Sequence, residues 1–550
     1  MKKLVSIFLA LALILSISIP VFAEGNTQEV TLTVNSNDTR YYEGHQLLEL
    51  LSMSLKDGAH ANCDGTNHKA DCYNYAYKVV DQYKEILQEE VAQYAGTNFW
   101  GNITQPATNQ ITDDDIARYL STLTSDSEAG FGTMRKVADR IYRAIKTENL
   151  EPEAEEFVGT TEIAKGYWIF ADVTPMEGEY NDNSLVIVKA LTQENITLTP
   201  KVGLPTLTKK VQDIEDSENP SIDNMEWLDS ADHDIGDKVP FKLTATLPSN
   251  VQYYDEYTLT FHDKLAAALQ LCDSTRLGAG SFKVFMYSDV GIANADYDLN
   301  AGIDVTNLFR AKTPTDDCTF ELTGNIYDLT DAHAIITPTT AFVVYYEAEL
   351  LAGAELGNPG NLNTAYLEFS NDPYDSNSTG KTEEDKVVVF TYSITVNKVD
   401  QNGNPLPGAG FTLYKKIQGQ LEPVAVGNEK GGENSDMTEF TWTGLDDGDY
   451  VLKETTIPEG FNGMAPREFS IIPEHKQNDD NPTLISLRTT SYNGDIDDGS
   501  ITFDVINRTG AALPETGAEG TFLLIAGGTL LVVLAAVFMI TRKKMSIYED

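Results

Sequence analysis

Residues 393–400 read Ser-Ile-Thr-Val-Asn-Lys-Val-Asp and alternate as a half-buried β-strand does. The period of two puts Lys398 on the same face as Ile394 and Val396. Turn and strand signals follow at residues 407–414 and 448–454, and Phe503 and Asn507 share a face of a strand near residue 505. The spacing predicts a small β-sandwich over residues 391–509 with polar side chains among its apolar rows.

These segments resemble the CnaB domain, an immunoglobulin-like sandwich of Gram-positive surface adhesins and pilins. The resemblance implies that Lys398 supplies an amine, Asn507 a carboxamide and Glu454 a catalytic acid, and that they form an isopeptide bond autocatalytically. Burial disfavours the charged form of a lysine, and folding supplies the proximity that the condensation needs. Ammonia would leave, and a crosslink would join the first and last strands.

Residues 203–390 contain many short alternating segments between turn signals, which predicts a second all-β sandwich. In residues 207–211, Lys209 is in phase with the apolar Leu207 and Val211, whereas Lys210 points outward. A strand near residue 345 places Val343, Tyr345 and Glu347 on one face.

Three further polar residues of this segment lie on apolar faces. Asp263 continues an inward row, and Asn361 and Asn363 are both in phase with the apolar residues that follow them. The segment resembles the collagen-adhesin (CnaA) type of sandwich, in which a lysine on the first strand and an asparagine on the last condense beside an acid. The resemblance implies Lys209, Asp263 and one of the two asparagines; a buried salt bridge without covalent chemistry is the alternative.

Residues 24–202 mix both periodicities. Alternating strands are expected at residues 30–34, 166–170 and 184–188, and helices at residues 77–94 and 133–145. The predicted fold class is therefore mainly β, with tandem immunoglobulin-like (CnaA/CnaB-type) β-sandwiches and a helical insertion in the first domain.

The two ends carry export signals. Residues 1–23 have a basic start, an apolar run and a small-residue cleavage site, as a signal peptide does. Residues 510–550 contain an apolar run at 521–540 that is long enough for a transmembrane helix, followed by a basic tail. The pentapeptide before that run is Leu513, Pro514, Glu515, Thr516 and Gly517.

This order resembles the LPxTG sorting signal of Gram-positive surface proteins. The resemblance implies that a sortase cuts between Thr516 and Gly517 and passes the Thr516 carbonyl to an amine. Pro200 and Lys201 resemble the pilin motif that supplies such an amine, although Thr199 and Val202 replace the usual flanking residues. Lys165 and Lys189 are the other candidates, and an ordinary exposed lysine is the alternative at position 201.

Charge and cysteine content limit the partners and cofactors that the chain is expected to have. The formal net charge is −45 with no basic patch, which argues against a nucleic-acid partner. Cys63 and Cys72, and Cys272 and Cys318, are expected to be disulfides or free thiols in an exported chain. His68 near the first pair lacks zinc-finger spacing, so no metal and no cofactor are expected.

Together the resemblances imply a secreted, peptidoglycan-anchored pilus subunit on the cell surface. Its expected partners are a pilus-specific sortase, a housekeeping sortase, other copies of itself, and minor pilins at the tip and base. A monomeric wall-anchored adhesin is the alternative, because it shares every feature except a working acceptor lysine. A hydrolase is disfavoured, because the chain has no G-x-S-x-G or H-E-x-x-H motif.

Overall fold

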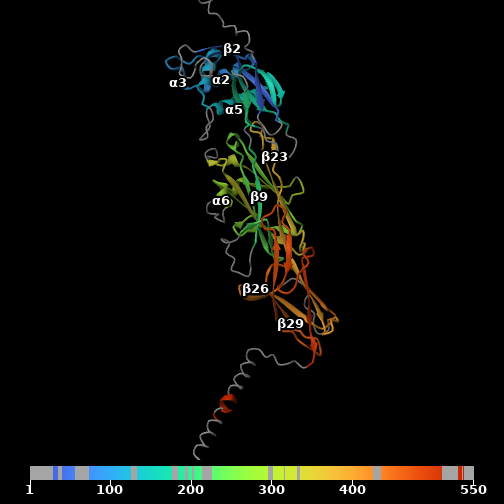
Figure 1. Cartoon of the computed structure of the whole chain (residues 1–550). Coiled ribbons are helices and arrows are strands. Elements are labelled where there is room, and N and C mark those ends of the chain that lie inside the picture. Colours follow the sequence, from blue (N-terminus) through green and yellow to red (C-terminus); the bar gives the residue numbers. More distant parts are fainter. Residues whose placement is uncertain are drawn as a thin grey trace, which may run out of the picture.

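The computed structural model describes residues 29–34, 40–55, 73–124, 133–175, 184–192, 196–200, 203–213, 226–294, 302–314, 316–330, 335–424, 435–510, 531–535 and 537. Three β-rich parts follow one another along an elongated molecule, from blue through green to red in Figure 1. Strands predominate in every part, which confirms the mainly β fold class.

The N-terminal part consists of two sheets and a group of helices. One sheet has the order β3–β2–β6–β7 with β4 beside β2, and the other has the order β5–β1–β8. The strands are β1 (Glu29–Val34), β2 (Tyr42–Leu55), β3 (Tyr73–Val79), β4 (Ala154–Phe157), β5 (Thr160–Ala164), β6 (Gly166–Asp172), β7 (Ile187–Leu191) and β8 (Ile196–Leu198). The helices are η2 (Asp81–Tyr83), α2 (Lys84–Tyr94), α3 (Gly96–Trp100), η3 (Thr108–Gln110), α4 (Asp113–Ser121) and α5 (Thr133–Glu148).

Strand β6 explains this layering, because it is buried on both faces. Trp168 and Phe170 pack into the core between the two sheets, whereas Ile169 and Ala171 pack into the core under the helices. The helices lie between β3 and β4, which confirms the predicted insertion. The helix expected at residues 77–94 begins only at Lys84, because the alternating residues before it pair with β2 as strand β3.

The middle part is a sandwich of two sheets around one large core. One sheet has the order β10–β9–β12–β21–β17–β18 with β14 on β21, and the other β11–β24–β22–β13–β20–β19 with β23 on β22; β15 and β16 pair separately. The strands are β9 (Leu207–Gln212), β10 (Trp227–Leu228), β11 (Ser230–Asp232), β12 (Lys238–Thr246), β13 (Thr258–Leu265), β14 (Leu269–Leu271), β15 (Ser274–Thr275), β16 (Gly278–Ala279), β17 (Phe282–Tyr287), β18 (Ile303–Asp304), β19 (Arg310–Lys312), β20 (Phe320–Asn325), β21 (Ala341–Leu350), β22 (Asn361–Ser370), β23 (Thr379–Lys381) and β24 (Asp385–Phe390). The short helices are η5 (Val251–Tyr253), α6 (Val290–Asn294), η7 (Thr306–Leu308) and η8 (Ile326–Asp328).

The C-terminal part is a smaller sandwich of two main sheets. The sheet β28–β25–β33 faces the sheet β27–β26–β29–β31–β32 across a shared core, and β30 pairs with β34. The strands are β25 (Tyr392–Val399), β26 (Gly410–Ile417), β27 (Gln420–Pro423), β28 (Glu439–Leu445), β29 (Gly448–Thr456), β30 (Phe461–Asn462), β31 (Arg467–His475), β32 (Leu484–Arg488), β33 (Ser500–Ile506) and β34 (Arg508–Thr509). Strands β25 and β33 run parallel to each other, and Lys398 pairs with Val505.

The two sandwiches are joined with almost no linker. Only Thr391 separates β24 from β25, and Val388 and Phe390 of β24 belong to the core of the C-terminal part. The backbone N–H of Asp229 also donates to the carbonyl oxygen of Gln477 (2.7 Å). The junction is therefore a packed interface, not a free hinge.

In the described part of the chain, no helix is long and apolar enough to cross a membrane. The signal peptide lies outside the described residues, as do the sorting pentapeptide and most of the predicted transmembrane run. The structure therefore gives no description of these three segments.

Candidate functional site

Lys209 lies at the centre of the middle sandwich. Its strand β9 alternates as predicted, because Leu207, Lys209 and Val211 are buried and Thr208 is exposed. Cross-strand pairing places Lys209 beside Leu243 of β12. The side chain of Lys209 is fully buried, so its amine requires polar partners inside the core.

The partners of this amine come from the strands around it. Lys209 Nζ donates to Asp263 Oδ2 and to Tyr346 Oη (2.8 Å). Tyr346 Oη donates to Asp263 Oδ2 (2.8 Å), and Asn363 Nδ2 donates to the same hydroxyl oxygen (2.8 Å). One tyrosine hydroxyl therefore connects the amine, the acid and the carboxamide.

Two oxygen atoms in this group have no hydrogen-bond partner. They are Asp263 Oδ1 and Asn363 Oδ1, and both are buried. Buried polar atoms are nearly always hydrogen-bonded in folded proteins. The arrangement thus leaves the carboxamide oxygen and one acid oxygen available in a dry core, as a carboxyl group that will polarise an amide requires.

Burial sets the protonation of the group. Desolvation lowers the pKa of Lys209, although the Asp263 carboxylate opposes that change. Desolvation raises the pKa of Asp263 against the opposite effect of Lys209, and raises the pKa of Tyr346 well above its usual value. Both shifts favour a neutral amine beside a protonated acid, which is the pair that a nucleophilic attack needs.

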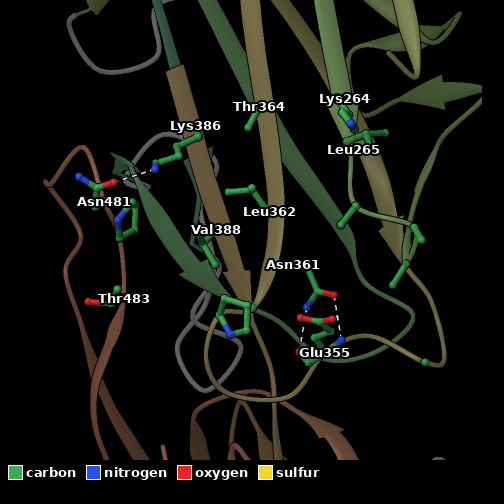
Figure 2. Close-up of a pocket in the computed structure, with 17 residues that line it drawn as sticks. Lys264, Leu265, Glu355, Asn361, Leu362, Thr364, Lys386, Val388, Asn481 and Thr483 are labelled. Carbon is green, nitrogen blue, oxygen red and sulfur yellow. Dashed lines mark hydrogen bonds between the residues drawn. The ribbon is translucent and has the colours of Figure 1, made fainter. Parts of the chain in front are cut away.

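The structure distinguishes the two candidate asparagines. Asn361 Nδ2 donates to the carbonyl oxygens of Glu355 (3.0 Å) and Val389 (3.1 Å), and its Oδ1 accepts from the Glu355 N–H (3.0 Å). Figure 2 shows this pairing with Glu355 at the wall of a pocket of about 590 Å³ between the two sandwiches. Asn361 is therefore fully occupied with backbone groups, and Asn363 is the residue that meets the lysine group.

The structure shows which face of β21 is the inner one, and it corrects the expected position of the asparagine. The inner face of β21 carries Phe342, Val344 and Tyr346, not Val343, Tyr345 and Glu347. Almost all of β21 is buried, so both faces are apolar and alternation could not choose between them. Asn363 lies on β22, which β23 and β24 follow, so it is not on the last strand of the sandwich.

The C-terminal sandwich contains a second buried lysine group. Lys398 is fully buried, and its Nζ donates to the carbonyl oxygens of Val399 (3.3 Å) and Val505 (3.2 Å). The backbone N–H of Asn507 donates to the same Val399 carbonyl (3.1 Å). The amine and Asn507 are thus gathered around one carbonyl, as the parallel pairing of β25 and β33 requires.

Glu454 of β29 completes this group. Asn507 Nδ2 donates to Glu454 Oε1 (2.7 Å), while Glu454 Oε2 accepts from the backbone N–H of Met464 (2.8 Å). Asn507 Oδ1 is buried without a hydrogen-bond partner. Desolvation lowers the pKa of Lys398, and the Glu454 carboxylate acts against that change.

Both groups combine the same functional elements, namely a buried amine, a carboxylic acid and a carboxamide whose oxygen is unpartnered. They differ in one residue, because Tyr346 has no counterpart among the contacts of Lys398. Sequence reasoning missed Tyr346. Its phase with Phe342 and Val344 was the available signal, but it needed the identity of the inner face.

The structure describes two of the three lysines that were candidates for the sortase acceptor. Lys201 lies outside the described residues. Lys165 is buried and Lys189 is half-buried on β7, so Lys165 is the less accessible of the two. Lys201 stays a prediction.

Two of the four cysteines are described. Cys272 and Cys318 are both free thiols, and Cys63 and Cys72 lie outside the described residues. Cys272 donates its backbone N–H to Glu347 of β21, whereas Cys318 precedes β20 in the opposite sheet. Burial, followed by a hydrogen bond to Asp316, raises the pKa of the Cys318 thiol to about 12.

Comparison with known families matches two segments of the chain. Residues 392–482 match the SpaA family, described as a prealbumin-like fold domain, and residues 507–546 match the LPXTG cell wall anchor motif. The first segment includes Lys398 and Glu454, and the second includes Asn507 and the sorting pentapeptide.

The trypsin-resistant surface T6 protein of Streptococcus pyogenes serotype M6 is 26% identical over 280 residues, which cover 48% of this chain and 45% of that protein. The chain thus spans about half the length of the curated relative that it matches. Among solved structures, it is similar to the T6 backbone pilin of the same organism, with a TM-score of 0.46 and 17% identity over 88% of this chain and 98% of the other. The major pilin SpaD of Corynebacterium diphtheriae gives a TM-score of 0.40 and 15% identity over 88% and 97%.

The matches to the family models confirm the LPXTG sorting signal and a β-sandwich domain in the C-terminal part. The anchor motif implies sortase processing and attachment of a secreted protein to the cell wall. The chain is homologous to the T6 surface protein and carries a SpaA prealbumin-like domain and an LPXTG anchor.

Proposed function

We propose that the chain is the backbone subunit of a pilus polymerised covalently on the cell surface. A pilus-specific sortase would join Thr516 of one copy to Lys201 of the next, and a housekeeping sortase would attach the base to peptidoglycan. Donor and acceptor in one chain permit a head-to-tail polymer that does not close on itself. Minor pilins at the tip and base would be the other partners. The chain is then a structural protein without catalytic turnover.

The observation that carries this proposal is the pair of buried amine–acid–carboxamide groups. Each of them joins strands that are far apart in sequence, β9 with β22 and β25 with the residue after β33. Each buried lysine costs free energy, and a surface protein that is not under load has no evident need for two of them. A covalent bond at each position would hold the two joined strands together, so the sandwich would resist unfolding under tension.

The proposed reaction is a single condensation at each site. In the C-terminal sandwich the lone pair of Lys398 Nζ attacks the Asn507 side-chain carbonyl carbon, and a new C–N bond forms. The bond from that carbon to Asn507 Nδ2 breaks. Glu454 accepts a proton from the amine and returns it to the leaving nitrogen, so ammonia departs and the acid is regenerated.

The same bonds form and break in the middle sandwich between Lys209 and Asn363, but the protonated Asp263 first gives its proton to the leaving nitrogen and then takes one from the amine, so ammonia departs and the acid is regenerated. Here the acid reaches the carboxamide through the Tyr346 hydroxyl, which contacts all three groups. Proton transfer through one hydroxyl is within the ordinary reach of general acid–base catalysis. Domain boundaries at about residues 203 and 391 would then place one bond in each sandwich.

A ladder of multimers in cell-wall extracts tests the polymer. We expect covalent multimers that survive boiling in detergent, and we expect Lys201→Ala to remove them. Lys189→Ala is the matched control and should leave the ladder intact, because that lysine lies on β7 of the same part. Single chains in the parent strain would favour the monomeric adhesin instead, and a ladder that persists in Lys201→Ala would place the acceptor at another lysine.

A further inference from the structure

A separate group of metal-ligating side chains lies on the outer face of the middle sandwich. His262 is the neighbour of Asp263 on β13, so its ring points away from the core that holds Lys209. The ring stacks on Tyr366 of β22 with ring centroids 4.3 Å apart. His262 is 4% exposed, yet neither of its ring nitrogens has a hydrogen-bond partner.

A buried imidazole with two unpartnered nitrogens points to a missing ligand. Desolvated nitrogen atoms cost free energy unless something binds them, and native proteins rarely leave them so. Tyr366 covers one face of the ring and uses its hydroxyl elsewhere, donating to Asp316 Oδ2 (2.6 Å).

Suitable ligands surround this imidazole. Asp316 Oδ2 lies 3.6 Å and Glu321 Oε1 lies 3.7 Å from His262 Nδ1, beyond hydrogen-bond distance in both cases. Donor atoms of His262, Asp316 and the free thiol of Cys318 all lie within 4.8 Å of one another. The backbone N–H of Cys318 donates to Asp316 Oδ1 (2.9 Å), which fixes the carboxylate beside the sulfur.

We propose that His262, Asp316 and Cys318 bind a zinc ion. Nitrogen, carboxylate oxygen and sulfur are the three donor types that Zn²⁺ takes from proteins, and soft sulfur disfavours Ca²⁺ and Mg²⁺. Glu321, which pairs with His262 across β13 and β20, is adjacent to the fourth position. The ion displaces the Cys318 thiol proton to solvent on binding.

The geometry requires only a small adjustment. Ligand distances of about 2.0–2.3 Å place the donors of a tetrahedral zinc ion about 3.5 Å apart. His262 Nδ1 and Asp316 Oδ2 already lie 3.6 Å apart, and the Cys318 sulfur, which lies within 4.8 Å of the other donors, needs to move by about 1 Å at most. Asp316 is exposed and Cys318 is half-buried in the segment before β20, where such a movement meets little packing. The bound ion would fix this segment to β13 on the sandwich surface.

The test is a titration of the purified protein with ZnCl₂ by calorimetry, and with CoCl₂ by absorption. Co²⁺ in the same site reports sulfur ligation through its charge-transfer band. We expect His262→Gln and Cys318→Ser each to weaken metal binding by at least about tenfold. Cys318→Ser should also abolish the charge-transfer band. Cys272→Ser is the matched control, since it removes the other described thiol, and it should change neither signal.

The variants distinguish this site from any other in the chain. Cys63, Cys72 and His68 lie outside the described residues and are unchanged in every variant. Zinc should also raise the midpoint of thermal unfolding of the parent and not that of Cys318→Ser. The proposal is overturned if the parent shows no saturable binding, or if binding is unaltered in both His262→Gln and Cys318→Ser.

Discussion

Replacing Lys398 by methionine tests whether a covalent bond closes the C-terminal sandwich. Methionine removes the amine but keeps an unbranched side chain in a position that is fully buried. Without the amine no bond to Asn507 can form. The parent should lack the mass of two ammonia molecules, and Lys398→Met should lack only one.

The expected loss of stability follows from the size of the loop that the bond closes. By the chain-entropy estimate for crosslinks, a loop of about 110 residues stabilises the folded state by about 5 kcal/mol at 25 °C. For a domain of this size, each kcal/mol corresponds to about 4 °C in the unfolding midpoint. The C-terminal sandwich of Lys398→Met should therefore unfold about 20 °C below that of the parent.

The assay combines intact mass with scanning calorimetry, and Glu454→Gln is the matched control. That variant keeps the lysine and removes the carboxylate that accepts from Asn507 Nδ2. If the crosslink supplies the stability, each variant should lack only one ammonia molecule relative to the mass of its own sequence, and both should show a similar fall in midpoint. A Lys398→Met protein that still lacks two ammonia molecules would refute the assignment of the amine. A changed mass with a midpoint within about 3 °C of the parent would refute the loop-entropy argument.

Three further predictions concern single side chains. Asn363→Ala should abolish the middle crosslink and lack one ammonia molecule instead of two, whereas Asn361→Ala should still lack two, because Asn361 binds only backbone groups; a reversed result would exchange the two. Tyr346→Phe should slow crosslink formation in newly synthesised protein about tenfold, as expected for one lost hydrogen bond to the reacting amide, and mass spectra after a pulse label measure this rate. Burial, and then the neighbouring Tyr75, raise the pKa of Tyr77 to about 12 in the folded state. An unfolded tyrosine titrates near pH 10, so the stabilisation from the protonated side chain is complete below about pH 10. That stabilisation is lost as the pH rises toward 12. The unfolding midpoint of the N-terminal part should fall over that range, and less so in Tyr77→Phe; equal falls would exclude Tyr77 as the cause.

The sequence was most informative where a strand has one buried face. In β9 and β25, alternation alone placed Lys209 and Lys398 inward, and both proved fully buried. The roles of Glu454 and Asn507 needed the family resemblance, because acids and amides are common in this chain. The structure brings both residues together by a hydrogen bond of 2.7 Å.

Alternation of apolar and polar residues gave no orientation for strands whose two faces are both buried. Strand β21 is buried on both faces, so the pattern of its residues could not show which face points into the core. For that reason Tyr346 was missed. Asn361 and Asn363 are two residues apart and share a phase, so only the three-dimensional position of Tyr346 and Glu355 separates their roles. The group of His262, Asp316 and Cys318 combines β13 with the segment before β20, which are distant in sequence, and no local motif marks it.

The two proposed crosslinks also determine how far a subunit can stretch. If tension enters at Lys201 and leaves at Thr516, the N-terminal part lies outside the path of the force. The bonds bypass the chain between Lys209 and Asn363 and between Lys398 and Asn507. About 50 residues remain in the path, and fully extended they span at most about 180 Å.

Single-molecule stretching of the polymer measures this limit. The longest unprotected stretch runs from Asn363 to Lys398 and includes β24, whose Val388 and Phe390 pack in the C-terminal core, so we expect extension to begin with the separation of the two sandwiches. No subunit of the parent should lengthen by more than about 180 Å before a covalent bond breaks. In Lys398→Met the C-terminal sandwich rejoins the path, and an additional step of about 380 Å should appear. Steps of that length in the parent would show that the chain bears load without its crosslinks, because a closed loop cannot release the residues that it contains.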